Sequence, residues 1–229
     1  MIGYPQAMSN SVIAHVQQTK QALFDHAGPG WITQTGGVII DQNFVLPDVT
    51  DHVTALPSIE TFVVSADGSV TSTGTDGDLN NAWQPIVERL AAHVLAWAQA
   101  SGVEIVGDSY VTASVTKANE VNGEAHFDDD QFNPQSGSGL VAIVGDRDGP
   151  RIAAEPIPHV DIHAPRPVVA TEALKTAFAE GEIGSIAYGP NELVALPQFA
   201  QLHAGPGCCG SASEVRHLLV YRASTAPPL

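Results

Sequence analysis

The stretch GLVAIVGDRDGPRIAA, residues 139–154, sets the fold class of this 229-residue chain. It holds two short strand-forming runs, Gly139–Val144 and Arg151–Ala154, on either side of a polar turn that contains glycine and proline. Runs of this kind bounded by turn residues predict short strands that reverse direction. Further short strand-forming runs lie at Val103–Val106, Tyr110–Thr116, Ile183–Tyr188, Leu193–Leu196 and Val215–Tyr221. So many short strands after Gly102 predict a barrel or a sandwich.

Two helices are predicted around these strands. Between residues 79 and 101 the apolar side chains follow the i, i+3, i+4, i+7 spacing of an amphipathic helix that packs on the outside of a sheet. They are Trp83, Ile86, Val87, Leu90, Val94 and Trp97. Gly102 can take the left-handed conformation that ends this helix. A second helix is expected from Thr171, a candidate N-cap, to Gly181.

The first third of the chain is predicted to support the barrel. Helical spacing from Ser9 to Ala27 predicts a further helix, and short extended runs at Gly37–Ile40 and Glu60–Ser65 predict strands that extend a sheet. The second run continues through a turn into residues 70–73, which predicts a hairpin. We expect one α+β domain over residues 1–229, with residues 1–102 as helical and sheet-extending support and residues 103–229 as the core.

Composition and charge restrict the classes of partner that we expect this protein to bind. With 9 basic and 25 acidic side chains the net charge is −16, which argues against nucleic acid as a ligand. No run of about 18 apolar residues and no export signal is seen, so we expect a cytoplasmic protein without a membrane partner. Cys208 and Cys209 are neighbours, too close for a mutual disulfide. Lysine occurs only at positions 20, 117 and 175, so a basic side chain inside a pocket would stand out.

His126 and Asp128 form the first candidate for a chemical site. They lie two residues apart in HFDDDQF, residues 126–132, so on an extended backbone both side chains leave the same face. A second imidazole would complete the two-histidine, one-carboxylate set that holds Fe(II) with three coordination positions open. His203 is the candidate for that third ligand. A rival set, His159, Asp161 and His163, shares one strand face in a proline-rich segment and could itself hold a metal.

Several segments in order along the chain resemble the Fe(II)/2-oxoglutarate-dependent oxygenase superfamily. HFDDDQF is followed by the apolar strand at residues 139–144, then by GPNELVALP at residues 189–197 and by LHAGPG at residues 202–207. RHLLVY, residues 216–221, is similar to the last strand of that family. The resemblance covers residues 110–224, and it identifies no subfamily.

The resemblance implies a double-stranded β-helix, which is a jelly-roll or cupin-like barrel, with N-terminal supporting helices. It implies that His126, Asp128 and His203 are the catalytic Fe(II) ligands. It also implies that a later basic residue holds the far carboxylate of 2-oxoglutarate, since a guanidinium pairs bidentately with a carboxylate. Arg216, 13 residues after His203, is the favoured clamp, and Arg222, which begins an Arg-x-Ser triplet, is the alternative. A second contact could come from Thr112, Ser114, Thr116 or Lys117.

The activity implied by the resemblance is that of a dioxygenase that uses Fe(II), 2-oxoglutarate and O₂. Such an enzyme oxidises a C–H bond, most simply by hydroxylation, through an Fe(IV)=O species, and its substrate would be a small molecule, an amino acid or a peptide. Asp128 disfavours a halogenating variant, which needs that ligand position vacant. Two alternatives stay open. One is a cupin-like metal-dependent isomerase or oxygenase built on His159, Asp161 and His163 without 2-oxoglutarate, and the other is a non-catalytic β-sandwich binding module.

Overall fold

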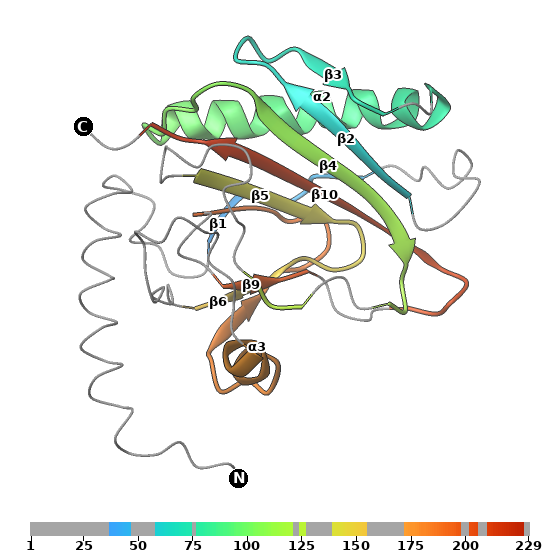
Figure 1. The fold of residues 1–229 in the computed structure, drawn as a ribbon, viewed down its shortest axis with the longest axis vertical. Coiled ribbons are helices and arrows are strands. Elements are labelled where there is room, and N and C mark those ends of the chain that lie inside the picture. Colours follow the sequence, from blue (N-terminus) through green and yellow to red (C-terminus); the bar gives the residue numbers. More distant parts are fainter. Residues whose placement is uncertain are drawn as a thin grey trace.

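A computed structural model describes residues 37–46, 58–74, 77–120, 124–126, 139–154, 172–197, 202–205 and 210–226. Within these residues it has two antiparallel sheets and two helices (Figure 1). The large sheet has the strand order β1-β8-β5-β10-β4-β2-β3, and the small sheet has the order β7-β6-β9. The strands are β1 (Val38–Asp41), β2 (Ser58–Val64), β3 (Val70–Ser72), β4 (Ser109–Lys117), β5 (Gly139–Gly145), β6 (Arg151–Ala153), β7 (Ser185–Ala187), β8 (Leu193–Pro197), β9 (His203–Ala204) and β10 (Val215–Ser224).

The chain alternates between the two sheets, and this alternation defines the fold. It leaves the large sheet after β4, reaches the small sheet at His126, and returns to the large sheet as β5. It then forms β6 and β7 in the small sheet, β8 in the large, β9 in the small and β10 in the large. His126 joins β9 through two backbone hydrogen bonds with His203, N–H to O, of 2.8 and 3.0 Å. This winding is a double-stranded β-helix with supporting elements, as predicted.

Helix α2 (Gly77–Ala100) covers one face of the large sheet (Figure 1). Its side chains Trp83, Leu90 and Val94 are fully buried, and they belong to one apolar cluster with Val111 and Ala113 of β4. The predicted helix over residues 79–101 is therefore confirmed, with the apolar stripe packed on the sheet. Gly102, with φ of 70°, takes the left-handed conformation after its end.

The opposite face of the large sheet is turned toward the small sheet, and we call the facing surfaces of the two sheets the interior. An apolar cluster with members from both sheets fills part of it. Its members are Val141, Ile143, Ile152, Tyr188, Val194, Leu196 and Leu218. Because side chains alternate along a strand, β10 sends Leu218 to the interior and Leu219 to the α2 side. This alternation fixes which residues of β10 can reach a site between the sheets.

Most of the remaining elements agree with the predictions made from the sequence. The second helix, α3 (Glu172–Ala179), lies on the outer face of the small sheet, and β2 and β3 pair as the predicted hairpin. Strands β1 and β2–β3 extend the two edges of the large sheet. The predicted strand at Val103–Val106 is wrong, since only Ile105 forms an isolated bridge there, to Thr225. Gly107, with φ of 72°, turns the chain away directly afterwards.

Two further expectations can be placed against the described residues. The helix predicted from Ser9 to Ala27 lies outside them. No helix within them is both long enough and apolar enough to cross a membrane.

Candidate metal and carboxylate site

His126 and His203 meet on the interior side of the small sheet. Their ring centroids are 4.5 Å apart with 54° between the ring planes. His203 pairs with Ile152 of β6, so both side chains leave the same face of the sheet, and Ile152 packs in the interior cluster. His203 is 2 % exposed and His126 is half-buried. Two imidazoles that are distant in the sequence therefore share one place between the sheets.

The tautomer of His126 follows from its hydrogen bond. Nδ1 of His126 lies 2.7 Å from the carbonyl oxygen of Glu124, and a carbonyl can only accept. Nδ1 therefore carries a proton, and in the neutral ring Nε2 is the nitrogen that can bind a metal. A metal-binding histidine typically donates its other ring N–H to a carbonyl or carboxylate in this way. Neutral imidazole with a free Nε2 lone pair is the form that binds a metal.

Asp128 and the rival set of His159, Asp161 and His163 lie outside the described residues, as do Cys208 and Cys209. Of the predicted ligands the described part thus contains His126 and His203. It contains no group of three or more His, Cys, Asp or Glu side chains that could hold a metal ion.

Arg216 is fully buried at the start of β10. By strand alternation its side chain shares the interior side of the sheet with Leu218. Its guanidinium Nη2 donates to the carbonyl oxygens of Glu120 and Lys117, which lie at and just after the end of β4. From this end of β4 the chain runs on to His126, so Arg216 lies on the side of the barrel where the connection to the histidines begins.

Arg222 lies on the same face as Arg216, which is expected for two residues six positions apart on a regular strand. At about 3.3 Å per residue, their backbones are about 20 Å apart along β10. Arg222 is half-buried and pairs with Tyr110 and Val141, near the other end of the barrel. The two arginines therefore cannot serve the same ligand group.

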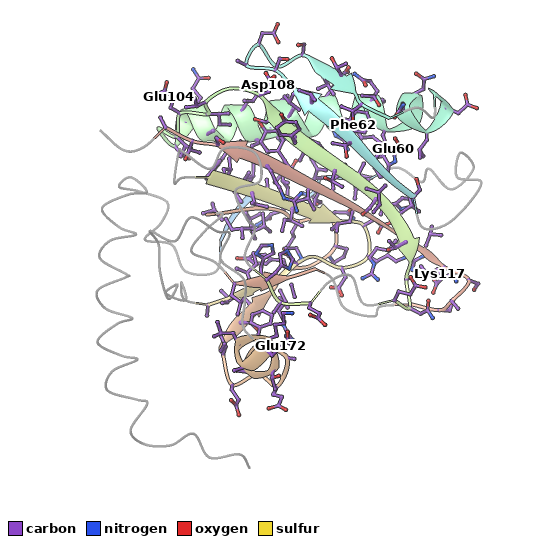
Figure 2. The ribbon with its side chains drawn as sticks, viewed as in Figure 1. Glu60, Phe62, Glu104, Asp108, Lys117 and Glu172 are labelled. Carbon is purple, nitrogen blue, oxygen red and sulfur yellow. The ribbon has the colours of Figure 1, made fainter. Side chains whose placement is uncertain are left out.

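Thr116 stands directly opposite Arg216 in the β4–β10 ladder, on the same face of the sheet. Its Oγ1 is buried and has no hydrogen-bond partner among the described residues. Of the other predicted contacts, Thr112 and Ser114 also face the interior side, whereas Lys117 is exposed at the end of β4 (Figure 2). A buried hydroxyl beside a buried guanidinium is a pair of groups that a carboxylate oxygen would satisfy.

One polar pair near Arg216 was not recognised in the sequence. His217 is directed to the α2 side, where its ring lies 6.0 Å from the ring of Trp83. Its backbone N–H donates to Asp146 Oδ1 at 2.9 Å, and its Nδ1 lies 2.6 Å from Asp146 Oδ2. These contacts join β10 to the residue that directly follows β5. The strand period of two could have predicted the outward direction of His217, but not its partner, which is 71 residues away.

No family model matches the chain, and no curated protein matches it in sequence. Solved structures do match in fold. HygX from Streptomyces hygroscopicus, with nickel and 2-oxoglutarate bound, aligns with a TM-score of 0.43 at 12 % identity over 84 % of each chain. EvdO2 from Micromonospora carbonacea var. aurantiaca, complexed with 2-oxoglutarate, aligns with a TM-score of 0.38 at 16 % identity, over 64 % of this chain and 65 % of that one.

A third match is the Fe(II)/(alpha)ketoglutarate-dependent dioxygenase TqaL, with a TM-score of 0.41 at 9 % identity over 96 % of this chain and 89 % of that one. This chain spans less than two thirds of the length of EvdO2. The strand order of this chain, and its alternation between the two sheets, are by themselves those of a double-stranded β-helix. At these identities the likeness is one of fold.

Proposed function

We propose that this protein is an Fe(II)- and 2-oxoglutarate-dependent dioxygenase that oxidises, most simply by hydroxylation, a C–H bond of a small molecule, an amino acid or a peptide. The observation that carries the proposal is the meeting of His126 and His203 on the interior side of the barrel, with ring centroids 4.5 Å apart. Asp128, two residues after His126, would supply the carboxylate of a two-histidine, one-carboxylate site.

The described residues fit such a metal. The carbonyl of Glu124 keeps the proton of His126 on Nδ1, which leaves Nε2 as the ligand atom. His203 is buried and joined to His126 by two backbone hydrogen bonds, so the two rings are held side by side before any metal binds. When bound, Fe(II) with 2-oxoglutarate supplies the activation of O₂ that C–H oxidation requires. The contribution of the chain is to hold its ligands rigidly on a β scaffold.

Arg216 and Thr116 would bind the far carboxylate of 2-oxoglutarate. The guanidinium is already oriented by the carbonyls of Lys117 and Glu120, so little side-chain freedom is lost when a carboxylate pairs with it. The Thr116 hydroxyl, which has no hydrogen-bond partner among the described residues, can donate to the same carboxylate. Apolar side chains such as Ile143 and Leu218 keep water from the rest of the interior, which strengthens this ion pair.

Anaerobic titration of the full chain with Fe(II) and 2-oxoglutarate tests the proposal. The chelate formed by the cosubstrate on the metal has a visible metal-to-ligand charge-transfer band, and we expect one equivalent to saturate it. His203→Ala should abolish the band. His93→Ala is the matched control, because His93 is a half-exposed histidine of α2 outside the barrel, and it should leave the band intact. A folded, iron-loaded wild-type protein without the band would refute the proposal.

A second titration separates the two arginines. Truncation of one partner of a buried charge pair costs about 2–5 kcal/mol, which corresponds to a loss of affinity of roughly 30-fold or more. We therefore expect Arg216→Met to weaken 2-oxoglutarate binding by at least that factor, with Fe(II) binding retained. Arg222→Met should change it by less than about threefold. Equal losses in the two variants would contradict the assignment to Arg216.

A further inference from the structure

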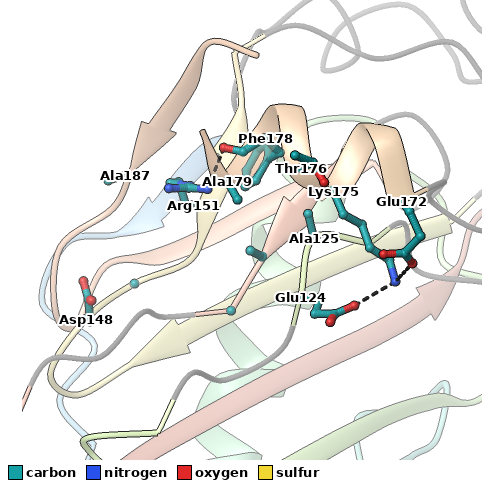
Figure 3. A pocket seen from close by; sticks show the side chains of 13 residues that line it. Glu124, Ala125, Asp148, Arg151, Glu172, Lys175, Thr176, Phe178, Ala179 and Ala187 are labelled. Atoms are coloured by element: carbon teal, nitrogen blue, oxygen red, sulfur yellow. Dashed lines mark hydrogen bonds and ion pairs between the residues drawn. The ribbon is translucent and has the colours of Figure 1, made fainter. Parts of the chain in front are cut away.

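A cavity of about 550 Å³ lies between α3 and the outer face of the small sheet (Figure 3). Small side chains leave this space open, among them Ala125, Ala204 and Ala187, and the ring of Phe178 lines it from α3. A volume of this size lies within the range of small-molecule sites. Sequence reasoning did not find it, because its lining comes from five separate segments of the chain.

This cavity is separate from the candidate metal site. Ala125 and Ala204 are the sequence neighbours of His126 and His203, so their side chains leave the opposite face of the same two strands. The histidines face the interior with Ile152, whereas Ala125 packs in the α3 cluster with Phe178. The cavity and the candidate metal site therefore lie on opposite faces of the small sheet.

The cavity contains one cation and one anion that make no ion pair among the described residues. Arg151 stacks on Phe178, with its guanidinium carbon 4.4 Å from the ring centroid, and its Nη2 donates to the Phe178 carbonyl at 2.8 Å. These contacts hold the guanidinium in place without neutralising its charge. Asp148, three residues before Arg151 in the chain, lines the same cavity. Figure 3 shows its carboxylate on the side of the cavity that Arg151 occupies, away from Lys175. The two groups are not within ion-pair distance of each other.

The other charges at the cavity are matched. Lys175 Nζ lies 2.7 Å from a carboxylate oxygen of Glu124 and 2.9 Å from one of Glu172 (Figure 3). With Lys175 occupied by these two partners, Arg151 and Asp148 are the groups left to recognise a ligand.

We propose that this cavity binds an α-amino acid as its zwitterion. The ligand carboxylate would pair with Arg151 and its ammonium group with Asp148, and its side chain would lie over the alanines that line the cavity. A zwitterion satisfies both charges at once, whereas a simple anion or a simple cation leaves one of them unpaired in a partly desolvated space. The site would act as a second, non-catalytic binding site, since neither His126 nor His203 lines it.

Isothermal titration calorimetry with three matched probes tests the proposal on the full-length, metal-free protein. The probes are L-leucine, N-acetyl-L-leucine, which lacks the ammonium group, and L-leucine methyl ester, which lacks the carboxylate. We expect L-leucine to bind with one-to-one stoichiometry and each derivative to bind at least about tenfold more weakly, because each loses one charge-assisted contact. No L-leucine binding at millimolar concentration, or equal binding of all three probes, would overturn the proposal.

Three variants locate the site. Arg151→Met and Asp148→Asn should each weaken L-leucine binding by about tenfold or more. Arg89→Met is the matched control, because Arg89 also stacks on a phenylalanine, 4.5 Å from the Phe44 centroid, and donates to a backbone carbonyl, but it lies on α2 away from the cavity. It should bind L-leucine like the wild type. If Arg151→Met unfolds α3, Asp148→Asn still decides, and wild-type affinity in Asp148→Asn would refute the zwitterion model.

The assay is independent of the oxygenase proposal, since it uses neither Fe(II) nor 2-oxoglutarate. A protein that binds L-leucine but shows no charge-transfer band would refute the dioxygenase and retain the amino acid site. The reverse result would retain the dioxygenase alone.

Discussion

Helices α2 and α3 cover their sheets in very different ways. Helix α2 has 24 residues and buries eight of them against the large sheet, where Trp83 and Val94 are wholly inaccessible. Helix α3 has eight residues, buries only Ala177 and Phe178, and leaves a cavity beside it. A long amphipathic helix closes an apolar face, and a short helix on a narrower sheet leaves space. We therefore expect the α2 side to contribute more to stability than the α3 side, where a cavity is open.

The same local contact serves both regions. Arg89 stacks on Phe44 on the α2 side, and Arg151 stacks on Phe178 on the α3 side. On the α2 side the phenylalanine is part of the continuous core, whereas on the α3 side the arginine is exposed to a cavity. The contact is thus the same in kind, and only the surroundings differ. The following substitutions test this contrast, from the largest expected effect to the smallest.

Trp83→Ala should have the largest effect on stability. It removes a fully buried indole from the α2 interface, and truncations of this kind cost about 3–5 kcal/mol. Urea denaturation followed by circular dichroism measures the free energy of unfolding. Trp83→Phe is the control, and it should cost less than about 1.5 kcal/mol because it keeps most of the ring and removes an indole N–H that has no hydrogen-bond partner among the described residues.

Phe178→Ala should cost less than Trp83→Ala, about 3 kcal/mol, because α3 buries only this ring and Ala177. Hydrogen exchange should show faster exchange in α3 with little change in α2. A loss as large as that of Trp83→Ala would mean that the two helices contribute equally, which would contradict the contrast.

Ala204→Val and Ala113→Val form a matched pair of insertions. Ala113 is fully buried under α2, so two added methyl groups should overpack the core and cost about 1–3 kcal/mol. Ala204 faces the cavity, where the same groups meet open space, and its change should stay within about 0.5 kcal/mol. Thermal unfolding of both variants measures the difference. Equal destabilisation would show that the cavity is closed in solution.

Lys175→Met should have the smallest effect, and it should depend on pH. In the folded protein the pKa of Glu124 lies below its ordinary value of 4.5, because Lys175 donates a hydrogen bond to it. The pair therefore contributes above pH 4.5, and its contribution disappears as the pH falls through the lowered pKa of Glu124. Exchange rates of α3 should differ between wild type and variant at pH 7 and converge in acid. A difference that persists in acid would mean that Lys175 acts through packing.

Most of the fold could be predicted from the sequence because local apolar periodicity indicates where helices and strands form. The apolar stripe of α2 and the short runs that became β4, β5 and β10 follow the helical and strand periods directly. The strand predicted at Val103–Val106 failed because only Ile105 bridges to Thr225 there, and Gly107 turns the chain away directly afterwards. For the candidate site, the sequence indicated His126, His203 and Arg216 as residues of interest. It could not indicate the carbonyl of Glu124 or the hydroxyl of Thr116 as their neighbours.

What the sequence alone determined is the kind of structure: two layers of short strands, an outer helix, and histidines at strand positions. These follow from periodicity, which acts between residues a few positions apart. The tertiary structure decided which distant segments meet: His126 beside His203, Thr116 opposite Arg216, and a short helix that leaves a charged cavity behind the histidines. The reason is that cross-strand register and helix packing depend on how side chains from remote segments fill a shared volume, and no single segment encodes that fit.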